Sequence, residues 1–315
     1  MKYVEKALKV IEEVEKVIIG KNQCIEKIME AILAEGHILI EDIPGVGKTS
    51  MALAFAKAMD LEQNRVQFTP DVLPTDILGF SMYQKDLGSF QYQPGAVMCN
   101  LFLGDEINRT SPKTQSALLE VMEEGTVTID GVTREIPKPF HVIATENPIG
   151  SVGTQMLPES QLDRFMICIQ IGYPDAADEL KILMDRHTKN PMEDLKPVIR
   201  REELILMQKE VEKVYIHPVI YQYIIALANE SRSHEMVELG ISPRGSLALS
   251  KMAKAVAYLK ERDYVTPNDV ESVFMDVGLH RICLNAKGKL NHMAGKDVIE
   301  DILMKVTKPK PEKMQ

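Results

Sequence analysis

Cysteine, long apolar runs and excess positive charge are all scarce in this chain of 315 residues. Its four cysteines, at positions 24, 99, 168 and 283, form no Cys-x-x-Cys pair, and no histidine cluster has zinc-binding spacing. This pattern argues against a disulfide framework or a structural metal and favours a reducing compartment, which we expect to be the cytoplasm. No apolar stretch approaches the roughly 20 residues that span a bilayer, and the first residues lack the apolar run of a signal peptide.

Negative charge exceeds positive charge, because 37 Lys and Arg face 46 Asp and Glu, a net of −9. Sequence-independent binding to nucleic acid requires a basic surface that displaces counterions. We therefore expect no nucleic-acid partner, although a local basic patch would not alter the net charge. The length suits about two domains of ordinary size.

Short apolar runs alternate with helical patterns in the first half of the chain. The alternation predicts an α/β fold with a mostly parallel sheet covered on both faces. One helix has clear ends, since Ser111 and Pro112 are typical of a helix start and Gly125 of a helix end. The expected strands lie at 37–41, 65–68, 100–103, 141–144 and 165–169.

Two stretches interrupt this alternation, and one composition change follows it. Asp130-Gly131 lies between alternating arms and predicts a hairpin, while residues 70–98 are predicted as a long irregular segment with room for a hairpin around Gly88. After Pro174 only helical patterns remain, over 175–189, 201–214, 217–232, 243–262 and 267–283. We therefore expect an α/β domain over 1–185, an all-α lid domain over 186–305 and a flexible tail over 306–315.

The central motif is a glycine-rich loop between an expected strand and an expected helix. Its residues Asp42-Ile43-Pro44-Gly45-Val46-Gly47-Lys48-Thr49 suit a phosphate-binding loop, in which glycines let backbone N–H groups face phosphate oxygens. Lys48 would reach the β- and γ-phosphates, and the Thr49 hydroxyl would ligate Mg²⁺. The nucleotide contacts expected here are Gly45, Val46, Gly47, Lys48, Thr49 and Ser50.

Further polar residues follow other expected strands. Asp105 can hold Mg²⁺, and the adjacent Glu106 can polarise an attacking water, which favours hydrolysis over transfer to a hydroxyl. Asn147 could hold that water, and Arg164 and Arg244 could stabilise charge on the transferred phosphoryl group. Read alone, the acidic pair could be a solvated strand end, Asn147 the start of an Asn-Pro turn, and each arginine a surface residue.

The order of these motifs closely resembles the MoxR family of AAA+ ATPases, which are P-loop NTPases. The resemblance covers roughly 15–285 and rests on Pro44–Thr49, Asp105–Arg109, Asn147–Pro148, Leu162–Phe165, Ser242–Arg244 and the segments 69–79 and 114–122. It implies Walker A and Walker B roles for the loop and the acidic pair, sensor 1 for Asn147, and sensor 2 for Arg244. It also implies that Arg164 is an arginine finger acting on a neighbouring subunit.

Several broader expectations come from the resemblance alone. It implies a ring hexamer that binds ATP and Mg²⁺ and remodels or activates a client protein complex, often with a von Willebrand factor A domain partner. Residues 17–20, Ile19 among them, would cradle the adenine, the hairpin at Asp130 would be the pre-sensor-1 hairpin, and 70–98 would hold the helix-2 insert. The chain departs from the family pattern at Asp42, the first Walker A position, and at Glu146, where Gln is common.

Other functions stay open at this point. One alternative is a nucleotide-dependent scaffold or regulator with little hydrolysis. A small-molecule kinase is disfavoured by the helical second domain, the Asp-Glu pair and Arg244. The chain's acidity disfavours a nucleic-acid translocase.

Overall fold

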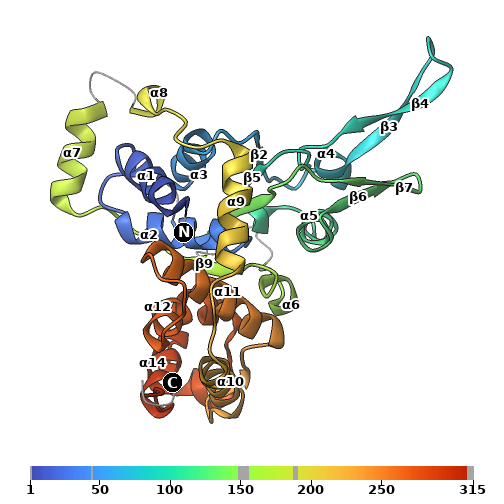
Figure 1. The fold of residues 1–315 in the computed structure, drawn as a ribbon. Helices are drawn as coiled ribbons and strands as arrows, with labels where there is room; N and C mark the ends of the chain where they lie inside the picture. Colours follow the sequence, from blue (N-terminus) through green and yellow to red (C-terminus); the bar gives the residue numbers. More distant parts are fainter. Residues whose placement is uncertain (1, 44, 148–155, 187–190, 311–315) are drawn as a thin grey trace.

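A five-stranded parallel sheet forms the centre of the amino-terminal half (Figure 1). The computed structural model describes all residues except 1, 44, 148–155, 187–190 and 311–315. Each strand overlaps one of the five predicted strands, and every neighbouring pair is parallel. In spatial order the strands are β2 (Gln63–Gln67), β5 (Leu101–Asp105), β8 (His141–Glu146), β1 (Ile38–Glu41) and β9 (Ile167–Ile169).

The strands β1, β5, β8 and β9 are buried on both faces, as their apolar runs predict, whereas the edge strand β2 is partly exposed. Along β1, Ile38 and Ile40 belong to one core, while Leu39 belongs to the other. The first core is shared with α1 (Val4–Glu15), α2 (Asn22–Leu33) and α3 (Lys48–Ala58) and continues into the carboxy-terminal helices. The second core is covered by α4 (Pro74–Leu78) and α5 (Pro112–Glu124), where Ser111 caps α5 through its bond from the Thr114 N–H at 3.2 Å.

Two antiparallel hairpins extend from the sheet domain on the same side of the molecule (Figure 1). The pair β6 (Thr126–Ile129) and β7 (Val132–Glu135) turns at Asp130-Gly131, and β3 (Gly79–Gln84) and β4 (Ser89–Pro94) turn around Gly88, as predicted. The expectation of an irregular segment over 70–98 is wrong for most of its length, because α4 and this hairpin order it. Two short helices, η1 (Ile107–Arg109) and α6 (Glu159–Leu162), complete this half.

The carboxy-terminal half is a helical lid region, whose main helices lie below the sheet domain in Figure 1. The helix α11 packs against its neighbours in the lid and also against α2. The start predicted at Thr266 is confirmed by a capping box, in which Asp269 accepts from the Thr266 N–H at 2.8 Å. The helices are α7 (Ala176–Arg186), α8 (Pro191–Asp194), α9 (Arg201–Glu212), α10 (Pro218–Ser233), α11 (Pro243–Leu259), α12 (Pro267–Gly278), η2 (Leu279–Arg281), α13 (Ala286–Leu290) and α14 (Gly295–Lys305).

Two details of this half correct the sequence prediction. The lid contains a small antiparallel pair, β10 (Val237–Leu239) and β11 (Cys283–Leu284), where only helices were expected. The helical pattern over 267–283 ends as a helix at Gly278, since η2 and β11 follow. Strands of two or three residues are too short to produce a readable alternation, so the sequence could not reveal them.

Some expectations fall on residues that the structure does not describe. Pro44 and Pro148 of the predicted motifs lie outside the described residues, as does the end of the expected tail from 311 onward. Within the described ranges, no helix combines the length and apolar character needed to cross a membrane.

Candidate active site

The glycine-rich loop joins β1 to α3, as predicted, and lies at the carboxyl edge of the sheet. Gly45 and Gly47 have φ of 88° and 93°, in the left-handed region that side chains with a Cβ rarely adopt. The Lys48 ammonium donates to the backbone carbonyl of Asp42 and, at 3.4 Å, to that of Glu146. Burial lowers the pKa of Lys48, although nearby carboxylates oppose this shift.

Asp42 stands at the first position of the loop, where the residue departs from the usual pattern. Its carboxylate accepts hydrogen bonds from three backbone N–H groups. One carboxylate oxygen accepts the backbone N–H groups of Ile171 at 2.7 Å and Gly172 at 2.6 Å, just after β9. The other accepts the N–H of Ile43 at 2.7 Å. The carboxylate therefore ties the start of the loop to the chain that leaves the sheet.

Asp105 ends β5 directly beside the first turn of α3. Its Oδ2 accepts from the Thr49 hydroxyl at 3.2 Å and from the Arg65 guanidinium at 2.7 Å, while Thr145 donates to Oδ1 at 3.4 Å. A hydroxyl and a carboxylate are hard oxygen ligands of the kind that Mg²⁺ takes beside a nucleotide. Thr49 and Asp105 therefore fit a magnesium ion, with Arg65 as the cation beside the same carboxylate oxygen.

Glu106 follows with an unusual backbone conformation, a φ of 57°. Its N–H donates to the Thr145 hydroxyl at 3.0 Å. Its carboxylate accepts from Gln67 at 2.9 Å and from Arg109 at 2.8 Å. A non-glycine residue in the left-handed region costs free energy. Here that conformation turns the side chain from the strand direction toward β2 and η1.

Glu146 ends β8 at the same edge, and Asn147 follows it. The backbone carbonyl of Asn147 accepts from the Asn108 amide at 3.2 Å. Glu146 is 3% exposed and lies opposite Glu41 in the sheet register. Burial, together with the Glu41 charge, raises the pKa of Glu146 to about 7, against the lowering effect of Lys48.

Ile19 lies half-buried in the segment between α1 and α2, next to the buried Val17 and Ile18. The next residue, Gly20, has a φ of 72° and lies against the Asp178 side chain, which leaves no room for a Cβ. The adenine segment expected from the sequence thus contacts the first turn of α7. Ser50 follows Thr49 in the first turn of α3 and is half-buried.

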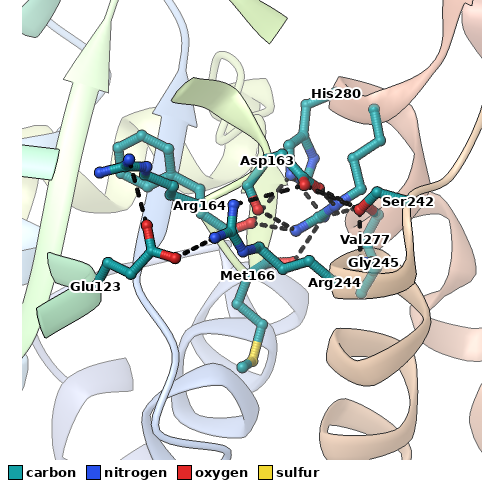
Figure 2. A network of polar contacts seen from close by, with 11 residues as sticks. Glu123, Asp163, Arg164, Met166, Ser242, Arg244, Gly245, Val277 and His280 are labelled. Carbon is teal, nitrogen blue, oxygen red and sulfur yellow. Dashed lines mark hydrogen bonds and ion pairs between the residues drawn. The ribbon is translucent and has the colours of Figure 1, made fainter. Parts of the chain in front are cut away.

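The two predicted arginines meet on a single carboxylate (Figure 2). Glu123, at the end of α5, pairs with Arg164 at 3.3 Å and with Arg244. Figure 2 also shows Asp163 between the sheet domain and the lid, where it accepts from Ser242 at 2.9 Å and from the buried Arg281 at 2.7 Å. This network fixes the start of α11 against the residues that precede β9.

The arginines and the phosphate loop lie at opposite edges of the sheet. Arg164 and Arg244 line a cavity of about 270 Å³ together with Gly36 and His37, which precede β1. Lys48, Thr49 and Asp105 lie where the parallel strands end. The structure therefore brings the loop residues together with the acidic pair and Asn147, and it brings the two arginines together, but it separates these groups within one chain.

A lysine-bearing glycine loop between a strand and a helix, with an acidic pair on a nearby parallel strand, defines a P-loop nucleoside triphosphatase. The family described as "ATPase family associated with various cellular activities (AAA)" matches residues 37–167, and the family described as "AAA lid domain" matches residues 229–302. The chain belongs to the AAA family of ATPases, in its MoxR-type branch.

Similar proteins cover nearly the whole chain. "Uncharacterized protein YeaC" of Bacillus subtilis is 45% identical over 96% of this chain and 94% of its own length. "Chaperone MoxR1" of Mycobacterium tuberculosis is 37% identical over 94% of this chain and 81% of its own length. A crystal structure of a candidate ATPase from Cytophaga hutchinsonii has a TM-score of 0.91, 37% identity, and coverage of 98% of this chain and 96% of that chain.

Sequence reasoning missed four residues that contact the predicted site: Arg65, Gln67, Glu123 and Thr145. Arg65 and Gln67 alternate along β2, and the parallel register places Gln67 opposite Asp105. The available signal was the run of polar residues in a strand whose neighbour ends in the acidic pair. No local sequence pattern links Glu123 to the arginines, because it is 41 residues from Arg164 and 121 residues from Arg244 along the chain.

Proposed function

We propose that this chain is a magnesium-dependent ATP hydrolase that acts as an oligomer. The convergence of Lys48, Thr49, Asp105 and Glu106 at one edge of the sheet carries this proposal. Lys48 and the loop N–H groups would bind the phosphates, with further contacts from Val46, Ser50 and Ile19. Thr49 and Asp105 would hold Mg²⁺, while Glu106 and Asn147 would orient and polarise the attacking water.

The arginines complete such a site from a neighbouring subunit. Arg164 and Arg244 lie at the opposite sheet edge from the loop of their own chain. A head-to-tail contact brings this edge of one copy to the loop of the next, and such contacts generate rings when the rotation closes. We propose a ring, most simply a hexamer, in which both arginines face the neighbour's nucleotide.

The biological task that we propose is chaperone-like remodelling or activation of a client protein complex. It is supported by family membership and by the 37% identity to a protein named a chaperone. A partner with a von Willebrand factor A domain is part of the same proposal, by analogy alone. The domain division at 185 and 305 is proposed from the change to helical patterns after Pro174, and a cytoplasmic location from the spacing of the cysteines.

A mixing experiment tests the shared site. Lys48→Ala removes the phosphate contact and Arg164→Ala removes the finger, so each protein alone should lose at least about 100-fold in ATPase rate. In a mixture, the intact loop of an Arg164→Ala subunit can meet the intact finger of a Lys48→Ala subunit, and activity should return. Arg201→Ala, which affects an exposed pair with Glu202, is the control and should keep full activity. Failure to recover activity at any mixing ratio would contradict the shared site.

One observation favours a second candidate, a nucleotide-dependent scaffold with little hydrolysis. The carboxylate expected to polarise water is bound to Gln67 and Arg109 in this structure. Glu106→Gln separates the two functions because it should abolish hydrolysis while ATP binding persists. If client activation survives in Glu106→Gln at the wild-type level, the scaffold is the better description.

A further inference from the structure

Helix α7 presents an apolar face that the other described residues leave exposed. Leu180, Leu183 and Met184 are 59%, 67% and 68% exposed. These residues follow i, i+3, i+4 spacing and therefore share one face of the helix. Asp178 and Ile182, on the opposite face, are the only side chains partly buried among the α7 residues whose side chains are described.

This exposure is unusual for a helix of this length. At 11 residues, α7 is shorter than the roughly 12–15 residues that an isolated helix needs to be even marginally stable in water. In proteins, packing of an apolar face supplies most of the stability of a helix. The exposed face of α7 therefore favours a partner surface beyond the described part of this chain.

The start of α7 is fixed beside the nucleotide loop. The chain leading into α7 is held by the Asp42 carboxylate at Ile171 and Gly172, and the Tyr173 carbonyl accepts from Lys21 at 2.8 Å. Asp178 packs on Gly20, in the expected adenine segment. The start of α7 therefore lies beside the expected nucleotide site.

A complementary surface lies on α11 beside the arginines. Arg244, Leu247 and Lys251 are exposed at i, i+3, i+7 spacing, so they form one stripe in which an apolar side chain lies between two cations. Leu247 is 65% exposed and lines the 270 Å³ cavity together with Met122. Asp175, which immediately precedes α7, and Glu179 in its first turn are exposed and carry charge opposite to that of the stripe.

We propose that the apolar face of α7 docks on the α11 stripe of a second copy of this chain. The inference rests on the proposed shared site, since the arginines that would reach the nucleotide belong to the same surface as the stripe. It adds a specific contact: Leu180, Leu183 and Met184 pack on Leu247, with Asp175 and Glu179 near Lys251. The contact is heterologous and directs each α7 toward the arginine-bearing side of the next subunit.

Cysteine cross-linking between two populations of full-length chains tests this contact. All chains carry Cys24→Ser and Cys283→Ser, which removes the two partly exposed native thiols. Chains with Leu183→Cys are mixed with chains with Leu247→Cys, in Mg²⁺ and a non-hydrolysable ATP analogue, and oxidised. The control partner carries Leu290→Cys, at a 78% exposed position on α13. We expect a covalent dimer at least about fivefold more abundant with Leu247→Cys than with Leu290→Cys.

The oligomeric size of the protein that carries only Cys24→Ser and Cys283→Ser separates the α7 contact from the shared nucleotide site. If this protein assembles but both cysteine pairs cross-link equally, the α7 contact is wrong while the shared site stands. If it stays monomeric at every concentration, the shared site fails and the α7 contact fails with it. As a second readout, Leu180→Glu with Leu183→Glu should raise the concentration for half-assembly at least about tenfold, whereas Leu290→Glu should leave it unchanged. Unaltered assembly of the double variant would overturn the contact.

Discussion

At the scale of single residues, Glu146 places a carboxyl group where the sheet excludes solvent. One of its oxygens is buried and has no hydrogen-bond partner among the described residues. A protonated carboxyl resembles the amide of Gln in shape and in hydrogen-bonding capacity, which relates this position to the Gln that is common there in the family.

The pH dependence of stability should show this burial. The pKa of Glu146 is raised from 4.5 to about 7, so its contribution to stability is fully present below pH 4.5 and is lost as pH rises through about 7. We therefore compare the unfolding free energy of Glu146→Gln with that of wild type at two pH values. The variant's value minus the wild-type value should be about 3 kcal/mol larger at about pH 8 than near pH 4.5. Urea unfolding of both proteins without nucleotide, across this range, provides the measurement. Parallel wild-type and variant curves would contradict the prediction.

Arg65 provides a second prediction at this scale. Its guanidinium is 2.7 Å from the Asp105 oxygen that also accepts from Thr49. A cation bound there must compete with the guanidinium, and an ion pair with one exposed partner is worth up to about 1 kcal/mol. Arg65→Ala should therefore bind Mn²⁺ about fivefold more tightly than wild type in the absence of nucleotide, measured by titration. Arg109→Ala is the control, because Arg109 pairs with Glu106 instead. Equal or weaker Mn²⁺ binding by Arg65→Ala would refute the competition.

At the scale of elements, Asp42 links the phosphate loop to the segment between β9 and α7. Asp42→Gly would restore the residue usual at the start of such loops, but it would leave the N–H groups of Ile171 and Gly172 without their acceptor. We expect a loss of about 2–4 kcal/mol in unfolding free energy, since buried donors of charge-assisted bonds are costly to leave unpaired. Asp42→Asn keeps one acceptor oxygen and should lose less. Chemical denaturation tests whether stability falls from wild type through Asp42→Asn to Asp42→Gly. An Asp42→Gly midpoint equal to that of wild type would show that the bonds from Ile171 and Gly172 contribute nothing to stability.

The elements that the sequence predicted well are those with local signals. Ser111 and Gly125 bound α5 because a cap and a left-handed glycine act within one helical turn. The four buried strands β1, β5, β8 and β9 were visible because each combines a short apolar run with a following turn or helix start, whereas β2 is polar and partly exposed. The β10–β11 pair and the exact end of α12 depend on tertiary pairing, which no local pattern records.

The candidate site divides in the same way. The phosphate loop and the Asp-Glu pair could be predicted because the strand–loop–helix order fixes their position at the carboxyl edge. The meeting of Arg164 and Arg244 on Glu123 could not, since it depends on how the lid packs against the sheet domain. The structural role of Asp42 was equally hidden, because its partners lie 129 and 130 residues away.

At the scale of the whole molecule, the residues of the candidate site are divided between two edges of one sheet. The lid is attached at the arginine-bearing edge through Asp163, which bonds both Ser242 and Arg281. A movement of the lid would therefore move Arg244 relative to Arg164. This arrangement couples lid position to the part of the molecule that would face a neighbour's nucleotide.

Glu123 sets the resting position of both arginines and provides the last prediction. In the proposed ring, Arg164 and Arg244 must exchange this carboxylate for a neighbour's phosphates. Glu123→Gln removes the charge that competes for them, and exposed pairs of this kind contribute up to about 1 kcal/mol each. We therefore expect the protein concentration for half-maximal ATPase rate to fall about threefold to tenfold, measured by steady-state hydrolysis over a dilution series. Glu124→Gln, at an exposed neighbouring position outside the network, should leave it unchanged. A rise in this concentration for Glu123→Gln alone would mean that the carboxylate orients the arginines toward the neighbour and does not compete for them.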